Sequence, residues 1–142
     1  MKIVLDTNTL VSAIGWEGPP ARILRACRAG RFDLITSPRL LEELTRIVTY
    51  PKLRVIAKHP ELPEILKWLH AAEHLVYPKK TVGIITVDPP DNRILECAVE
   101  GRADLIVSGN RHLLRLKLYE GIPIVRPIDF LRTLGVALTK QP

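Results

Sequence analysis

The sequence has little of what stabilises secreted and membrane-embedded proteins. Its 142 residues include only two cysteines, Cys27 and Cys97, each inside an apolar segment with helical patterning. We expect both to be reduced core thiols of a cytoplasmic protein, since they form neither a disulfide framework nor a zinc motif. The apolar runs are short, and the N-terminal stretch MKIVLDTN reaches an acid at position 6. We therefore expect no membrane span and no signal peptide.

Aromatic residues are also few, at 5%, but hydrophobic residues make up 46% of the chain. That share supports a real core and argues against intrinsic disorder, and the length is that of one domain. We expect a single domain over residues 1–142. Lysine and arginine number 21 against 15 acids, a net charge of +6. This charge is compatible with nucleic-acid binding, and equally with an ordinary solvated basic surface.

The hydrophobic periodicity predicts strands that alternate with helices. The expected strands are 2–5, 32–36, 104–107 and 122–125. The expected helices are 7–14, 19–29, 38–49, 51–75 with proline interruptions, 91–100, 110–115 and 127–134, with 77–90 extended. Such alternation implies right-handed crossovers, a mainly parallel sheet and an α/β fold.

Polar residues end two of the predicted strands. Asp6-Thr7-Asn8 follows the first strand, and Ser108-Gly109-Asn110 follows the third. In open parallel sheets the binding site lies beyond the carboxyl ends of the strands, where the strand order reverses. We therefore expect these two segments to border the site, although an acid such as Asp6 can also simply cap the helix that follows it.

Helical geometry separates two neighbouring acids in the helix from residue 38. Its apolar residues are Leu40, Leu41, Leu44, Ile47 and Val48. Glu42 lies roughly 160° from the centre of this face, and Glu43 roughly 100°. We expect Glu42 to lie in water and Glu43 to lean over the sheet edge.

The helix from residue 91 places a carboxylate on its apolar side. Asp91 lies within about 20° of the centre of the inner face, whereas Glu96 and Glu100 are predicted to point roughly the opposite way. An inward carboxylate is costly unless it is paired, although Asp91 could also serve only as a helix cap. Asp88 lies in the preceding turn, as a turn acid or an outer ligand.

Asp6, Glu43 and Asp91 come from distant segments but are directed to one edge of the sheet. Carboxylates brought together repel one another, so such a cluster requires a cation. An all-oxygen site suits Mg²⁺ or Mn²⁺, which activates water and neutralises charge in phosphoryl displacements. Together with the basic charge, this favours metal-dependent cleavage of a nucleic-acid phosphodiester.

At these residues the chain resembles PIN domains, and in particular single-domain toxins of the VapC type. Four segments carry the resemblance in order and spacing: IVLDTNTLVSA, SPRLLEEL, DPPDNRILECA and DLIVSGNRHLL. The resemblance implies a three-layer α/β/α sandwich, Mg²⁺- or Mn²⁺-dependent ribonuclease activity, an antitoxin partner and a homodimer. It assigns Asp6, Glu43 and Asp91 to the metal site and the catalysis. It assigns supporting roles to the polar residues Thr7, Asn8 and Ser108.

The chain departs from the family pattern in its fourth segment. Where the family usually has acids, this sequence has Asn110 and His112. Asn110 can still offer a carbonyl oxygen, but without charge, so metal affinity should fall unless Asp88 compensates. His112 is either a proton carrier or a partly exposed histidine without a role.

Two other functions compete with a ribonuclease toxin. The first is a PIN-like RNA- or metal-binding protein whose catalysis is weakened at Asn110. The second is a receiver- or phosphatase-like domain, which also uses a strand-end aspartate with Mg²⁺. The second is disfavoured, because no second acid follows Asp6 and no lysine follows the strand that ends before Ser108.

Overall fold

The computed structural model describes residues 1–86 and 89–139, with only the backbone for 134–139. The central sheet has five strands in the order β2-β1-β3-β5-β4. They are β1 (Lys2–Leu5), β2 (Asp33–Leu34), β3 (Leu105–Val107), β4 (Leu118–Tyr119) and β5 (Ile122–Val125). β1 pairs in parallel with β2 and β3, and β3 with β5, whereas β4 runs antiparallel to β5. The predicted mainly parallel sheet is confirmed.

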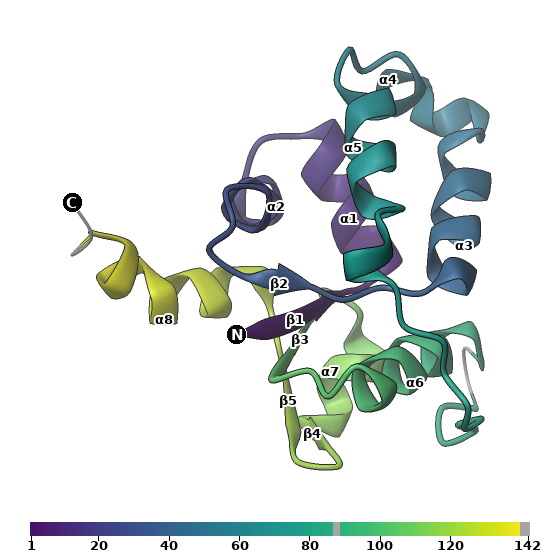
Figure 1. The fold of residues 1–142 in the computed structure, drawn as a ribbon, viewed down its shortest axis with the longest axis vertical. Coiled ribbons are helices and arrows are strands. Elements are labelled where there is room, and N and C mark those ends of the chain that lie inside the picture. Colours follow the sequence, from purple (N-terminus) through teal and green to yellow (C-terminus); the bar gives the residue numbers. More distant parts are fainter. Residues whose placement is uncertain (87–88, 140–142) are drawn as a thin grey trace.

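Helices cover both faces of this sheet (Figure 1). On one face lie α1 (Thr7–Gly15), α2 (Pro19–Arg28), α3 (Pro38–Val48), α4 (Arg54–Ala57) and α5 (Leu62–Leu69). On the other lie α6 (Asn92–Glu100) and α7 (Arg111–Leu116), and α8 (Pro127–Thr139) extends from one end. Short 3₁₀ turns occupy Pro51–Leu53, Ala72–His74 and Pro89–Asp91. The arrangement is the predicted three-layer α/β/α sandwich.

The strand β1 shows how the sequence produces two cores. Its side chains alternate between faces, as the period of two in a strand requires. Ile3 and Leu5 join the cluster beneath α1 to α5, and Val4 joins the cluster beneath α6. A strand buried on both faces is a continuous apolar run, which is why it could be predicted from four residues.

Both cysteines are free and buried, as expected. Burial raises the pKa of each thiol to about 12. A thiol that remains protonated at neutral pH is a poor nucleophile and metal ligand, so Cys27 and Cys97 contribute packing.

The observed elements differ from the predicted ones at several places, and the segment expected as one interrupted helix over 51–75 is divided into α4, α5 and two 3₁₀ turns. The strand expected at 32–36 is reduced to β2, because Thr36 instead exchanges backbone hydrogen bonds with His74 and Val76. The strand β4 was missed, since a tight turn through Glu120 and Gly121, both with positive φ, reverses the chain after only two residues. The last helix passes through Gly135, because a glycine inside a helix costs only about 1 kcal/mol.

Among residues 1–86 and 89–139, no helix combines the length and apolarity that crossing a membrane requires.

Candidate active site

Asp6 lies where β1 ends and α1 begins, and its side chain is only 5% exposed. One carboxylate oxygen, Oδ1, accepts a hydrogen bond of 2.8 Å from the backbone N–H of Thr9 and so caps α1. The other, Oδ2, accepts a hydrogen bond from the hydroxyl of Ser108. Burial raises the pKa of Asp6 above its ordinary value, although the hydrogen bonds from Ser108 and Thr9 lower it. The hydrogen bonds from Ser108 and Thr9 therefore do not fully offset the cost of burying the charged carboxylate.

The segment after β3 connects Asp6 to a second acid. Ser108 is fully buried, and its Oγ also accepts a hydrogen bond of 2.9 Å from the backbone N–H of Asn110. The side-chain Nδ2 of Asn110 donates to Oδ2 of Asp91 over 3.1 Å. Because β1 and β3 are adjacent and parallel, their carboxyl ends meet at one edge. A hydrogen-bonded chain therefore runs from Asp6 through Ser108 and Asn110 to Asp91.

Asp91 precedes α6 and is half-buried. Its side chain makes no capping hydrogen bond to that helix. The alternative that Asp91 is only a helix cap is therefore not supported. The carboxylate instead contacts Asn110, at the carboxyl edge of the sheet.

Glu43 faces a cleft between α3 and the start of α6. It is half-buried and Glu42 is exposed, as helical geometry predicted. The cleft has a volume of about 620 Å³ and is lined by Arg39, Glu42, Glu43, Arg46, Pro89, Pro90 and Arg93. Since Pro90 directly precedes Asp91, Glu43 opens toward the segment that carries the second acid.

The remaining predicted residues have varied environments. Thr7 is buried and Asn8 is exposed, both in the first turn of α1. His112 is half-buried, and its backbone N–H donates to Oδ1 of Asn110 over 2.7 Å. Asn110 thus caps α7 with its oxygen while its nitrogen contacts Asp91. Asp88 lies outside the described residues.

The geometry brings Asp6 and Asp91 into one network but does not close a cage around an ion. No group of three or more His, Cys, Asp or Glu side chains within the described part of the chain is arranged to hold a metal. The donors present are oxygens, and burial raises the pKa of Asp6 although both of its carboxylate oxygens accept hydrogen bonds. Oxygen donors suit a hard divalent cation, and an ion of this kind commonly keeps several waters and takes only one or two carboxylates.

The prediction that Glu96 points outward was wrong. Its side chain is 7% exposed, forms a 3.0 Å ion pair with Arg93 and accepts a 2.8 Å hydrogen bond from the N–H of Val82. Glu96 does lie on the side of α6 that faces away from the sheet, but that side is not in solvent. The extended segment before α6 covers that side of the helix.

Sequence reasoning also missed how this segment is held. Asn92, Glu96 and Glu100, four residues apart on α6, accept hydrogen bonds from three backbone N–H groups that are three residues apart. The donors are Ile85, Val82 and Lys79, respectively. Asn92 also donates to the carbonyl oxygens of Ile85 and Pro89. The signal was the spacing N-x₃-E-x₃-E, which anchors the chain leading to Asp91.

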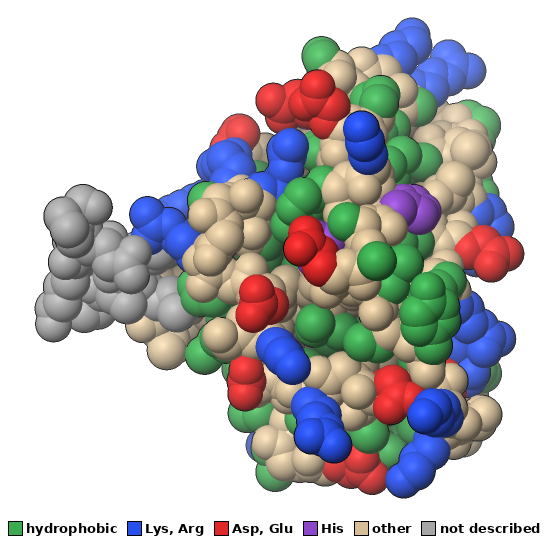
Figure 2. Space-filling view, in the orientation of Figure 1, with side chains coloured by type: hydrophobic (Ala, Val, Ile, Leu, Met, Phe, Trp, Pro, Cys, Tyr) green, Lys and Arg blue, Asp and Glu red, His purple; other side chains and the backbone are tan. Residues whose placement is uncertain are grey.

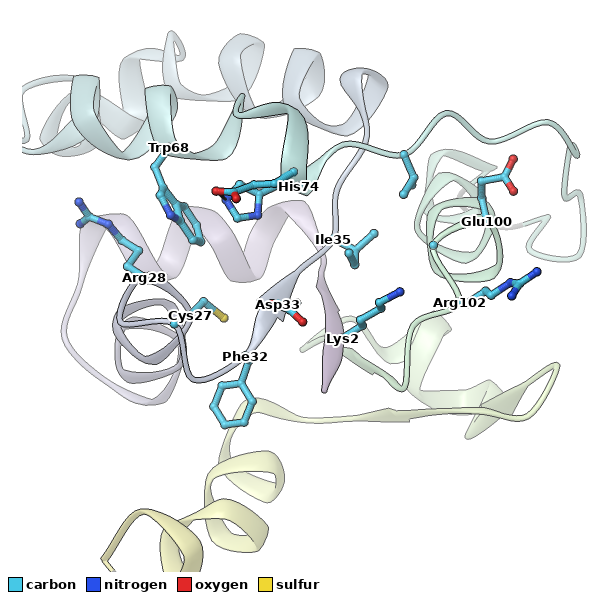
Figure 3. Close-up of a pocket in the computed structure, with 14 residues that line it drawn as sticks. Lys2, Cys27, Arg28, Phe32, Asp33, Ile35, Trp68, His74, Glu100 and Arg102 are labelled. Atoms are coloured by element: carbon cyan, nitrogen blue, oxygen red, sulfur yellow. Dashed lines mark ion pairs between the residues drawn. The ribbon is translucent and has the colours of Figure 1, made fainter. Parts of the chain in front are cut away.

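A second cavity, of about 640 Å³, lies at the opposite edge of the sheet (Figure 3). It is bordered by Lys2 and Asp33, where β1 and β2 begin, and by Trp68 and His74, whose rings lie 4.4 Å apart. His74 is buried, and its Nδ1 lies 3.1 Å from the carbonyl oxygen of Leu34. This cavity is therefore distinct from the acidic edge.

The fold and this edge define a class: α/β proteins with acids at the carboxyl ends of parallel strands. A family model described as the PIN domain matches residues 2–112. The chain therefore belongs to the PIN-domain family. Members of this family are generally nucleases and usually use divalent metal ions. No curated protein and no solved structure gives a significant match.

Proposed function

We propose that this protein is a divalent-metal-dependent ribonuclease and acts as the toxin of a toxin–antitoxin pair. The observation that carries the proposal is the hydrogen-bonded chain from Asp6 through Ser108 and Asn110 to Asp91. It fixes two carboxylates at the carboxyl edge of a parallel sheet, where α/β folds bind their ligands. The substrate is RNA, and the protein partner is an antitoxin.

In this proposal, Asp6, Asp91 and Glu43 hold Mg²⁺ or Mn²⁺, with Asp88 as an outer ligand. The ion, when bound, lowers the pKa of a water molecule and neutralises charge on the phosphate. Ser108 and Asn110 orient the carboxylates, because each donates a hydrogen bond to one of them. Thr7 and Asn8 support the turn after β1. The acting unit is one domain, residues 1–142, which we propose works in the cytoplasm as a homodimer.

The direct test is cleavage of mixed structured and single-stranded RNA by wild type and Asp91→Asn. The wild type should give products with Mg²⁺ or Mn²⁺ and none with EDTA. Asp91→Asn should be slower by about 100-fold or more, because it removes a charge that holds the ion. The matched control is Glu64→Gln, which removes an exposed carboxylate on α5 that does not line the cleft and should cleave normally. Cleavage that persists in EDTA, or in Asp91→Asn, would contradict the proposal.

A second candidate is a PIN-domain protein that binds RNA or metal with weakened catalysis. The observation that favours it is Asn110, which contacts Asp91 without adding a negative charge. The variant Asn110→Asp tests it. In EDTA this variant should melt at a lower temperature than wild type, because two carboxylates then lie side by side. Mn²⁺ should raise its melting temperature more than that of wild type, since a further negative charge beside Asp6, Asp91 and Glu43 strengthens ion binding.

The cleavage rate of Asn110→Asp separates the two candidates. A rate near that of an active wild type supports the ribonuclease. Activity in Asn110→Asp alone supports the weakened binder. Absence of activity in both proteins, with RNA still bound, counts against the idea that Asn110 causes the weakening.

A further inference from the structure

The cleft between α3 and α6 has an uneven lining. Three arginines line it, Arg39 and Arg46 from α3 and Arg93 from α6. Two prolines line it just before α6. Proline has no backbone N–H, so Pro89 and Pro90 offer van der Waals contact through their ring carbons. The wall from α3 therefore carries two arginines beside the carboxylates of Glu42 and Glu43, and the wall at the start of α6 combines carbon contact with Arg93.

The two arginines of α3 flank a proposed metal-site acid. Arg39 lies four residues before Glu43, and Arg46 lies three residues after it, so all three share one side of the helix. The two arginines are seven positions apart, which corresponds to roughly 10.5 Å along the helix axis. A chain that passes Glu43 along this helix meets a guanidinium on each side of the acid.

Arg93 is held in place more firmly than the other two. Its Nη1 lies 3.0 Å from the buried carboxylate of Glu96, and its side chain is 19% exposed. Glu96 is in turn fixed by the N–H of Val82. The charge of Arg93 is therefore already engaged by Glu96, whereas Arg39 and Arg46 are exposed.

The size of the cleft limits what enters it. Its volume of about 620 Å³ falls within the range of about 300–1,000 Å³ that encloses a ligand of drug size, which includes a nucleotide. On the face of the molecule in Figure 2, basic and acidic side chains are interspersed.

We propose that Arg39 and Arg46 bind the phosphates on either side of the cleaved phosphodiester. This inference rests on the proposed function, because it places the substrate beside Glu43. Arginine suits this role, since its planar guanidinium donates two parallel hydrogen bonds to phosphate oxygens. The ring carbons of the two prolines offer van der Waals contact to a sugar or a base.

The test is the salt dependence of binding in EDTA, where cleavage does not interfere. The probe is a short fluorescein-labelled single-stranded RNA of mixed sequence, measured by anisotropy. Each phosphate contact in a single strand contributes about 0.7 to the slope of log K against log salt. Arg39→Gln and Arg46→Gln should each lower that slope by about 0.7, and the double variant by about 1.4. Each single variant should bind about 3–5-fold more weakly at moderate salt.

The matched control is Arg22→Gln, which removes an exposed arginine from α2 and should leave the slope unchanged. Thermal melting establishes that each variant is folded. Wild-type slopes in the cleft variants, or an equal loss in Arg22→Gln, would overturn the proposal.

This outcome is separable from that of the proposed function. Metal-dependent cleavage by wild type with wild-type slopes in both arginine variants defeats the arginine assignment alone. An arginine-dependent slope without any cleavage defeats the ribonuclease proposal alone.

Discussion

Asp6→Asn is expected to abolish RNA cleavage and at the same time to raise the thermal stability of the metal-free protein. Asparagine is nearly isosteric with aspartate, and its side-chain oxygen can still accept the hydrogen bond from Thr9 that caps α1. It removes the charge on which ion binding depends, so cleavage should fall by about 10²–10³-fold. It also removes a buried charge without a cation, which should raise the melting temperature in EDTA by about 3 °C, or about 1 kcal/mol.

The pH dependence of this stability difference follows from the raised pKa of Asp6. Below the pKa of the unfolded chain, the carboxyl group is protonated in both states and burial costs nothing. As the pH rises through the higher pKa of the folded state, the charged form is buried and stability is lost. The advantage of Asp6→Asn should therefore be absent in acid and grow through that range.

Calorimetry of both proteins in EDTA over a pH series checks this prediction, with Glu64→Gln as control. Glu64 is exposed on α5 and does not line the cleft, so its substitution should change neither melting temperature nor cleavage appreciably. A lower melting temperature for Asp6→Asn at neutral pH would show that the hydrogen bond from Ser108 outweighs the cost of burying the charge. Wild-type cleavage by this variant would remove Asp6 from the site.

Glu96→Ala is expected to destabilise the protein by about 3 kcal/mol, with a fall in melting temperature of about 10 °C. The change leaves the guanidinium of Arg93 largely buried without its carboxylate. It also leaves the N–H of Val82 without its acceptor. The effect is large because one substitution removes both the ion-pair partner of Arg93 and the hydrogen-bond acceptor of Val82.

Two matched variants divide this effect into its parts. Glu96→Gln keeps an acceptor for Val82 but removes the charge opposite Arg93. Its free energy of unfolding should therefore lie between those of Glu96→Ala and wild type. Glu100→Ala removes only the hydrogen bond from Lys79, at the exposed end of the same row, and should cost about 1 kcal/mol or less. Urea unfolding gives the three free energies. Equal losses for Glu96→Ala and Glu100→Ala would contradict the importance of the buried pair.

The sequence was informative where a regular element carried a simple apolar pattern. The strand β1 is an apolar run buried on both faces, and the helix α3 buries one face, so both elements, and the different exposures of Glu42 and Glu43, were predicted correctly. The third strand likewise led to Ser108 and Asn110. For Asp91 the inward direction was predicted, but its contact with Asn110 was not, because nothing local joins two residues that are 19 apart.

The failures occurred where an irregular segment took the place of a regular element. Glu96 was assigned to solvent because residues 77–86 have no periodicity that marks them as a covering layer. Thr36 was assigned to a strand, although its backbone pairs with a turn 40 residues later, through His74 and Val76. Such contacts depend on backbone groups, which every residue carries, so side-chain pattern does not reveal them.

The two outer strands of the sheet, β2 and β4, are only two residues long. An outer strand with free backbone groups is a template on which another chain can extend the sheet, and length determines how strong that template is. Here Thr36 is already engaged by the chain that returns after α5. If two copies of this protein associate, side chains on the helical layers must supply the contact, and its specificity would then reside in residues free to vary without disturbing the sheet.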